Sequence, residues 1–319
     1  MSQGRVGHSP REGTERGRFD ATTLLLFAGC VVLASGNFIA VRYSNLELEP
    51  MWGAGLRFAL AAALFGLLAV VARAKAPLGH DRTLTLLYGL VNFGVFYALM
   101  YWSLLHVTAG TATVVIASVP LLTLLLAAAQ GLERLRGRAF IGAGLALAGI
   151  AWLTLGTSQF SGTPLALVTL VLAAAAIAQS IIFGKKIARH PPAVLNAIGM
   201  GVGAAVLLLL SLVAGERWVW PTLPEARWAL LYLVTFGSVG LFGLTLLLIR
   251  RWLPSSSAYV MVVVPIVTLL LESAIAGVPI TTAVVLGAVL VMVGAWFGAL
   301  SGATQRGGSP APSSRGARH

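Results

Sequence analysis

Charged residues are scarce in this chain of 319 residues, where Asp, Glu, Lys and Arg together make up 10%. A soluble domain carries roughly 25% charged residues. Hydrophobic residues make up 58% of the chain, and its mean hydropathy is +0.89. Because no soluble core could bury so large an apolar share, the low charge excludes an ordinary water-soluble fold and indicates lipid as the solvent.

Several chemistry-bearing patterns are also absent from the sequence. The single cysteine, Cys30, excludes a disulfide framework and any site with several thiolate ligands. There is no H-E-x-x-H, no G-x-S-x-G and no P-loop, so neither an intramembrane hydrolase nor an ATP-driven pump is expected. We therefore predict that the chain is not an enzyme and uses no cofactor or metal.

Apolar runs of spanning length fill most of the chain. A helix needs about 20 apolar residues to cross a bilayer. Ten such runs are found, at about 21–43, 50–72, 83–105, 109–130, 139–156, 163–184, 193–215, 227–249, 254–276 and 280–300. The sequence predicts an all-α polytopic membrane protein with ten transmembrane helices. The tails, 1–20 and 301–319, are rich in Gly, Ser, Pro and Arg and are predicted to be disordered.

The positive charges alternate from one connection to the next. Of the 22 lysines and arginines, 18 lie in the two tails and in every second loop. Since cytoplasmic loops carry the excess of Lys and Arg, both termini are predicted to be cytoplasmic, in a plasma membrane and most simply a bacterial inner membrane. The net charge of +12 is accounted for by this topology, so no nucleic-acid partner is expected.

Two segments of the chain repeat each other. Residues 111–151 align with 256–296 without a gap, which places Pro120 on Pro265, Thr123 on Thr268, Gly142 on Gly287 and Gly149 on Gly294. The alignment predicts two five-helix repeats, 21–156 and 163–300. Because five is odd, the second repeat begins on the opposite side of the membrane, and inverted repeats are typical of transporters.

The repeated prolines lie in the middle of predicted helices. A mid-helix proline frees the carbonyl four residues earlier, here Ile116 and Met261, and loosens the helix. Pro120 and Pro265 are therefore candidates for two gates, one in each half. A static kink accommodated by packing is the alternative reading for either proline.

Taken together, these features resemble the drug/metabolite transporter superfamily, specifically its ten-helix EamA-type members. The resemblance covers about residues 21–300 and rests on Ser35-Gly36-Asn37-Phe38, Leu56-Arg57-Phe58, Ala109 to Pro120, Gly131-Leu132-Glu133-Arg134, Gly142 and Gly149. It implies secondary transport, often export, through a central cavity lined by helices 1, 3, 4, 6, 8 and 9. The family usually has Gly-Glu after the ninth helix, whereas this chain has Gly277-Val278 there.

Two residues carry full charge at depth within the predicted spans, Arg57 and Glu272. Charged residues in a membrane are costly and usually functional. We expect Glu272 to pair with Arg57 or Arg42 and to shape the outward vestibule. Snorkelling of Glu272 to the headgroups and a structural tether role for Arg57 are the alternatives.

Neutral polar and aromatic side chains are the candidates for substrate binding. They are Asn37, Asn92 and Gln179, with aromatic walls from Tyr97, Tyr101, Phe242 and Tyr259. Such a lining suits a small amphipathic or aromatic solute. The amides could instead bridge helices.

The function predicted from these features is secondary active transport, by alternating access, of a small metabolite such as an amino acid. The expected partners are a small-molecule substrate and membrane lipid, and small-residue stripes such as Gly199-x3-Gly203 would also fit a homodimer contact. A non-transporting receptor or structural protein, and a facilitative, channel-like exporter of drugs or toxic cations, are the alternatives.

Overall fold

The chain was analysed as a computed structural model that describes residues 21–132, 137–155, 164–251 and 259–297. Within these ranges it is helical and contains no strand. The helices are α1 (Ala21–Ser44), α2 (Pro50–Val71), α3 (Gly79–Gly89), η1 (Leu90–Val95), α4 (Phe96–Ser103), α5 (Ala109–Ile116), α6 (Val119–Ala129), α7 (Gly137–Leu155), α8 (Pro164–Ile187), α9 (Pro192–Ala214), α10 (Pro224–Val234), η2 (Thr235–Gly240), α11 (Leu241–Arg251), α13 (Tyr259–Ala276) and α14 (Thr282–Ala295).

Seven helical segments in the described part are long and apolar enough to cross a membrane. They are α1, α2, α3 with η1 and α4, α5 with α6, α8, α9, and α10 with η2 and the start of α11. Three further apolar helices are shorter, within α7, α13 and α14. The all-helical membrane class is thus confirmed. Crossing by the three shorter helices remains a prediction.

Two helices begin three or four residues before the predicted start of their span. The third span was placed from 83 but begins at Gly79, and the eighth was placed from 227 but begins at Pro224. Both helices open with a polar turn that contains an acidic residue, Asp81 or Glu225. A negative charge favours a helix N-terminus, so the helix extends beyond the apolar run that predicted it.

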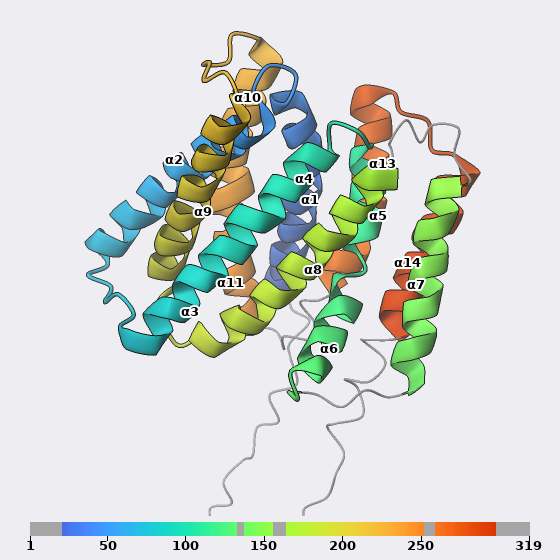
Figure 1. The fold of residues 1–319 in the computed structure, drawn as a ribbon, viewed down its shortest axis with the longest axis horizontal. Coiled ribbons are helices and arrows are strands. Elements are labelled where there is room, and N and C mark those ends of the chain that lie inside the picture. The colour runs from blue at the N-terminus through green and yellow to red at the C-terminus, as the bar shows by residue number, and fades with distance from the viewer. Residues whose placement is uncertain (1–20, 133–136, 156–163, 252–258, 298–319) are drawn as a thin grey trace, which may run out of the picture.

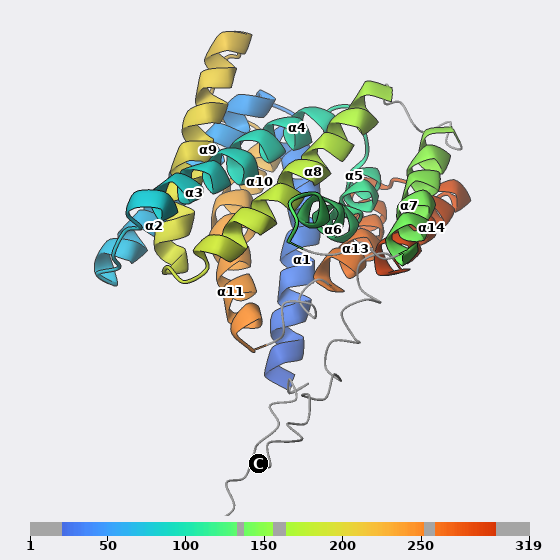
Figure 2. The same ribbon diagram turned by 60° about the horizontal axis from the view of Figure 1, so that its bottom comes forward.

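Most of the helices pack around one large buried cluster, and α5 and α14 share a second, smaller one. In Figure 1, α2 and α9 lie together on one flank of the molecule and α7 and α14 on the other, with α1, α8, α5 and α13 between them. Figure 2 shows the same grouping from a second direction, with α7 beside α14. The largest buried cluster joins side chains of α1, α2, η1, α4, α5, α8, α9 and α10.

The contact between α7 and α14 is reciprocal. A Cβ built on Gly149 would lie 2.9 Å from the carbonyl oxygen of Gly287, and one built on Gly294 would lie 2.6 Å from that of Gly142. The later glycine of each helix therefore meets the earlier glycine of the other, so the two helices run antiparallel. Only glycine permits so close an approach of two backbones, which explains the repeated Gly-x6-Gly spacing.

Two short π-helices occupy equivalent positions in the two halves. η2 starts and ends 145 positions after η1, and 145 is also the offset of the sequence repeat. Each interrupts a helix that would otherwise be continuous, between α3 and α4 and between α10 and α11. π-Helical turns are rare and concentrate at functional sites.

The two repeated prolines differ in conformation. Pro265 lies inside the continuous helix α13, as expected. Pro120 was expected in the middle of a helix, and this was wrong. The α-helix is interrupted at Ala117–Ser118, and Pro120 lies in the first turn of the next helix, α6. Proline suits a helix's first turn because its missing N–H would have no partner there.

Candidate functional site

One buried cluster is centred on Arg57 of α2, whose side chain has no exposed surface. Its Nε donates to Ser238 Oγ at 3.0 Å, and its Nη2 donates to the Gly237 carbonyl oxygen at 3.0 Å. Longer contacts reach Asn37 Oδ1 at 3.4 Å and Tyr101 Oη at 3.5 Å. These five residues, called the Arg57 cluster below, bring α1, α2 and α4 together at η2.

Aromatic rings surround the guanidinium. Its Cζ lies 5.0 Å from the ring centroid of Phe58 and 5.3 Å from that of Tyr97. Phe93 of η1 stacks parallel to Tyr97, with centroids 6.3 Å apart, and Phe242 lies 5.6 Å from Phe93. The positive charge is therefore held by ring faces and neutral polar groups.

Each π-helix is hydrogen-bonded to the first helix of the other half. Asn37 of α1 donates to the Gly237 carbonyl oxygen in η2 at 3.0 Å. Ser180 of α8 donates to Asn92 Oδ1 in η1 at 2.8 Å. Gly237 and Asn92 are 145 positions apart and so are equivalent in the repeat, and the two contacts together join the two halves.

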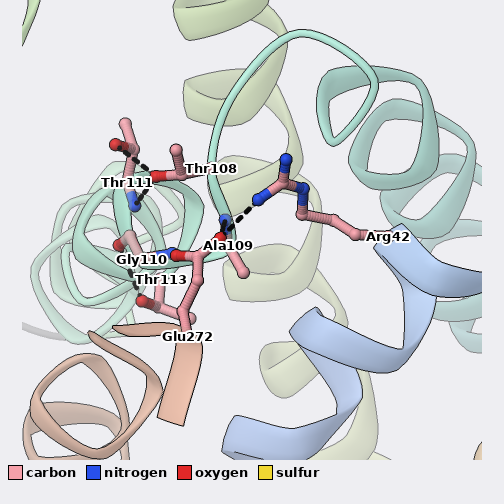
Figure 3. Close-up of polar contacts among 7 residues, drawn as sticks. All are labelled: Arg42, Thr108, Ala109, Gly110, Thr111, Thr113 and Glu272. Carbon is pink, nitrogen blue, oxygen red and sulfur yellow. Dashed lines mark hydrogen bonds and ion pairs between the residues drawn. The ribbon is translucent and has the colours of Figure 1, made fainter. Parts of the chain in front are cut away.

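A second cluster is built on Glu272 of α13, which is 2% exposed (Figure 3). Its carboxylate forms an ion pair with Arg42 of α1. The same carboxylate accepts from the backbone N–H groups of Ala109, at 2.9 Å, and Gly110, at 2.7 Å. With Thr108, these residues form what is called the Glu272 cluster below.

The backbone groups that bind Glu272 are the free N–H groups at the start of α5. Thr108 is the N-cap of α5, and its side chain accepts from the backbone N–H of Thr111 at 3.2 Å. A carboxylate at a helix N-terminus is stabilised both by these unpaired donors and by the helix dipole. Glu272 thus ties α13 to the start of α5 and, through Arg42, to the end of α1.

A small cavity of about 20 Å³ adjoins this cluster. It is lined by His106, Val107, Thr108, Thr111, Leu269, Glu272, Val278, Pro279, Ile280 and Val284. Such a space holds about one water molecule. It is too small for an organic solute, so the space beside Glu272 is not itself a solute site in the structure.

Two further polar contacts lie at opposite ends of the helix bundle. In the first, called the α3 clasp below, Asp81 Oδ2 accepts from Arg189 Nε at 3.0 Å and lies 2.7 Å from His190 Nε2. In the second, called the α10 clasp below, Glu47 Oε2 accepts from the backbone N–H of Thr222 at 2.7 Å and from that of Leu223 at 2.8 Å. In both, the loop after the first helix of one half meets the start of the third helix of the other.

The α10 clasp also changes the titration of its carboxylate. The side-chain hydrogen bond from Thr222, followed by the backbone bond from Leu223, holds the pKa of Glu47 below its ordinary value of 4.5. Each of these bonds favours the charged form. Glu47 is therefore ionised wherever the clasp is intact at neutral pH.

Many of the residues singled out from the sequence lie in these clusters. Asn37, Arg57 and Tyr101 belong to the Arg57 cluster, and Tyr97 lies against its guanidinium. Phe242 contacts Phe93, and Asn92 is bonded to Ser180 of α8. Of the two arginines considered for Glu272, the structure pairs it with Arg42.

Two of the predicted substrate residues lie apart from that centre. Gln179 accepts from Gln130 Nε2 at 2.8 Å, which joins α8 to the end of α6. Tyr259 is the first residue of α13, and its side chain falls outside the described part of the chain.

Several residues that the structure places in these sites are not among those singled out from the sequence. Gly237 acts through its backbone carbonyl, and Ser238 is a small residue of a kind that is common in membrane helices. Ala109 and Gly110 act through backbone N–H groups, which leave no side-chain signal. The offset of 145 could have drawn attention to Gly237, because it falls on the equivalent of the candidate residue Asn92 in the other half.

Comparison with known proteins identifies one family and relatives that are named as transporters. The model of the EamA-like transporter family matches residues 21–155 and again 164–299. The chain is 31% identical over 280 residues to the "Probable amino-acid metabolite efflux pump" of Salmonella typhimurium, covering 84% of this chain and 91% of that protein. It is 28% identical over 257 residues to the "Uncharacterized inner membrane transporter YedA" of Escherichia coli K12, covering 79% and 82%.

A solved crystal structure has the same fold. It superposes with a TM-score of 0.60 at 22% identity and covers 90% of this chain and 99% of its own. The duplicated family match, the apolar helices and the shared fold agree with one another. The chain is a multi-pass membrane protein that belongs to the EamA-like transporter family.

Proposed function

We propose that this protein is a secondary active transporter that exports an amino acid, or a similar small amphipathic or aromatic solute, by alternating access. Membership of a transporter family supports transport, and the relative named as an amino-acid metabolite efflux pump supports the substrate class and the direction. The proposed location is the bacterial inner membrane, with both termini cytoplasmic. The end that holds the α10 clasp is then the outer face, and the end that holds the α3 clasp is the inner face.

The proposed architecture is ten crossings arranged as two inverted five-helix repeats. The duplicated family match, the antiparallel contact of α7 with α14 and the equivalent π-helices all support it. Inverted halves allow a central site to open first to one face and then to the other.

The observation that carries the proposal is the pair of π-helices, each bonded to the first helix of the opposite half. A solute bound between the halves must separate contacts of this kind. The candidate substrate-binding residues are Asn37, Asn92, Tyr97, Tyr101, Gln179, Phe242 and Tyr259. Most of them lie around this junction.

The proposed outer gate is the Glu272 cluster, reinforced by the α10 clasp. Arg42 and Glu272 hold α1, α5 and α13 together, so access from outside requires this ion pair to part. On the inner side, the α3 clasp and the Gln130–Gln179 bond occupy corresponding places. The helix interruption before Pro120 and the proline inside α13, Pro265, are the proposed joints.

A flux experiment tests the proposal. The purified protein in liposomes loaded with unlabelled amino acid should accumulate labelled amino acid by counterflow, with saturation. Flux without saturation or counterflow would favour a channel-like exporter, and no flux would favour a receptor or structural role. Labelling should also place residues 131–138 and 250–251 on the same face, because emergence on opposite faces contradicts the inverted repeat.

A further inference from the structure

We infer that Arg57 recognises the carboxylate of the transported solute, so that the substrates are small carboxylates with an apolar or aromatic body. This inference rests on the proposed function and deepens it. It starts from a buried positive charge for which the described part of the chain supplies no negative partner.

The charge of Arg57 is buried, and all of its hydrogen-bond partners are neutral. They are a serine hydroxyl, a backbone carbonyl, an amide oxygen and a tyrosine hydroxyl. The buried carboxylate of Glu272 is bound to Arg42 and to the start of α5 instead. In the described part of the chain, no acidic side chain contacts Arg57. Buried charges in proteins are normally paired, so an anion from outside the chain fits this place.

The geometry of the hydrogen bonds shows where such an anion would bind. A guanidinium carries five N–H donors. The bonds from Nε to Ser238 and from Nη2 to Gly237 are both 3.0 Å long. The contacts to Tyr101 and Asn37, from Nη1 and Nη2, are 3.5 and 3.4 Å long and correspondingly weak. The edge formed by Nη1 and Nη2 is therefore the weakly bonded one, and two nitrogens side by side match the two oxygens of a carboxylate.

The surroundings restrict the rest of the ligand. Phe58 and Tyr97 lie against the guanidinium, and Phe93 and Phe242 extend the aromatic surface. One cation suits a single negative charge, whereas a phosphate ester would need more positive groups than these residues provide. An amine without a carboxylate would be repelled by Arg57. The site thus fits a monocarboxylate whose body is apolar or aromatic, a class that includes apolar amino acids.

In the structure, Arg57 is covered on all sides, and the contact of α1 with η2 is part of that cover. Asn37 and Arg57 both contact the Gly237 carbonyl oxygen, and Arg57 has no exposed surface. A carboxylate that replaces the two long contacts would leave the two short bonds to η2 intact. Binding would therefore change the junction between the halves without unfolding it.

A ligand panel tests the inference without requiring transport. Thermal stability of the purified full chain in detergent is measured with phenylalanine, 3-phenylpropionate, phenylalaninamide and phenethylamine. We expect the two carboxylates to stabilise the protein at concentrations at least roughly tenfold lower than the amide and the amine, because a site built to bind one polar group rejects analogues that lack it. Equal stabilisation by acid and amide would overturn the inference.

Variants of Arg57 test whether this residue causes the preference for carboxylates. Arg57→Gln should remove the distinction between acid and amide, and Arg57→Lys should keep the distinction with weaker binding, because lysine retains the charge but not the two-pronged geometry. Arg82→Gln removes an exposed arginine and should behave like wild type. An Arg57→Gln protein that still prefers carboxylates would overturn the inference. The wild-type panel decides it alone if that variant does not fold.

Counterflow with the same compounds separates this inference from the proposed function. Carboxylate-selective binding with no counterflow of any compound would contradict transport of this class but leave Arg57 as a carboxylate site. Counterflow of amide and amine as fast as that of the acids would support transport and contradict the assignment of Arg57.

Discussion

Glu272 and Arg42 lie 230 positions apart in the chain and form an ion pair between α13 and α1. The Glu272 side chain is 3% exposed and that of Arg42 is 37% exposed, so the pair is only partly screened by solvent. We expect Glu272→Gln and Arg42→Gln each to lower the free energy of unfolding. The double variant should lose less of it than the sum of the two single losses. A double-mutant cycle of unfolding should give a coupling of about 1–2 kcal/mol. Additive effects would show that the pair contributes nothing to stability.

Gly237 is the residue of η2 around which the Arg57 cluster closes. A Cβ at this position would overlap Asn37 Oδ1 and lie 3.4 Å from Arg57 Nη2. Gly237→Ala should therefore lower stability by about 1–3 kcal/mol, the range of overpacked sites, and should abolish transport. The matched control is Gly201→Ala in α9, where a Cβ meets nothing within 4 Å. That change should leave thermal stability unchanged or raise it, because alanine is the better helix former.

The glycine contact of α7 with α14 gives a symmetric prediction. Gly149→Ala and Gly294→Ala should each destabilise the protein by a similar amount, about 1–3 kcal/mol, since each Cβ would press on a backbone of the other helix. Gly144→Ala, on the same helix α7 but with open space around it, should be neutral. Melting temperatures in detergent measure all three. A marked loss from Gly144→Ala alone would contradict this packing.

The two clasps should act in opposite directions on the conformational equilibrium. Asp81→Asn weakens the inner contact and should favour the inward-open state, whereas Glu47→Gln weakens the outer contact and should favour the outward-open state. A cysteine introduced at Thr111, beside Glu272, should then react with an impermeant maleimide from outside more slowly in the first variant and faster in the second. Each change should be about two- to fivefold, as expected for exposed polar contacts. Changes of the same sign in both variants would count against alternating access.

The α10 clasp should also depend on pH. The pKa of Glu47 is lowered in the folded protein, so its contribution to stability is fully present above its ordinary value of 4.5 and is lost as the pH falls through the lowered folded pKa. The difference in melting temperature between wild type and Glu47→Gln should therefore be constant at neutral pH and shrink below about pH 4.5. A difference that persisted unchanged at the lowest pH tested would mean that the hydrogen bonds to Glu47 do not require its charge.

The sequence predicted the membrane class and the repeat because both leave signals along the chain. Long apolar runs predict helices in lipid, and the gap-free offset between Pro120 and Pro265 predicts equivalent segments. The same offset relates η1 to η2, which no composition or periodicity could have shown. A π-helical turn depends on one extra residue being accommodated by neighbouring helices, and those neighbours are distant in sequence.

The candidate site could be predicted in part. Arg57 and Glu272 stand out because charge within an apolar run is costly, and Asn37 because amides are rare there. Their partners did not stand out, because most are backbone groups: the Gly237 carbonyl and the N–H groups of Ala109 and Gly110. The choice of Arg42 over Arg57 as the partner of Glu272 depends on how α1 and α13 pack, which short-range sequence patterns do not record.

The nearly identical segments 119–126 and 264–271 have different conformations. The helix is interrupted before Pro120, whereas it is continuous through Pro265. Their threonines have diverged as well: Thr123 bonds to the Val119 carbonyl, whereas the buried hydroxyl of Thr268 has no partner in the described structure. A protein made of two copies of the same half would therefore have two interrupted helices or two continuous ones, and not one of each. The two segments thus differ in helix continuity and in hydrogen bonding even where their sequences agree most closely.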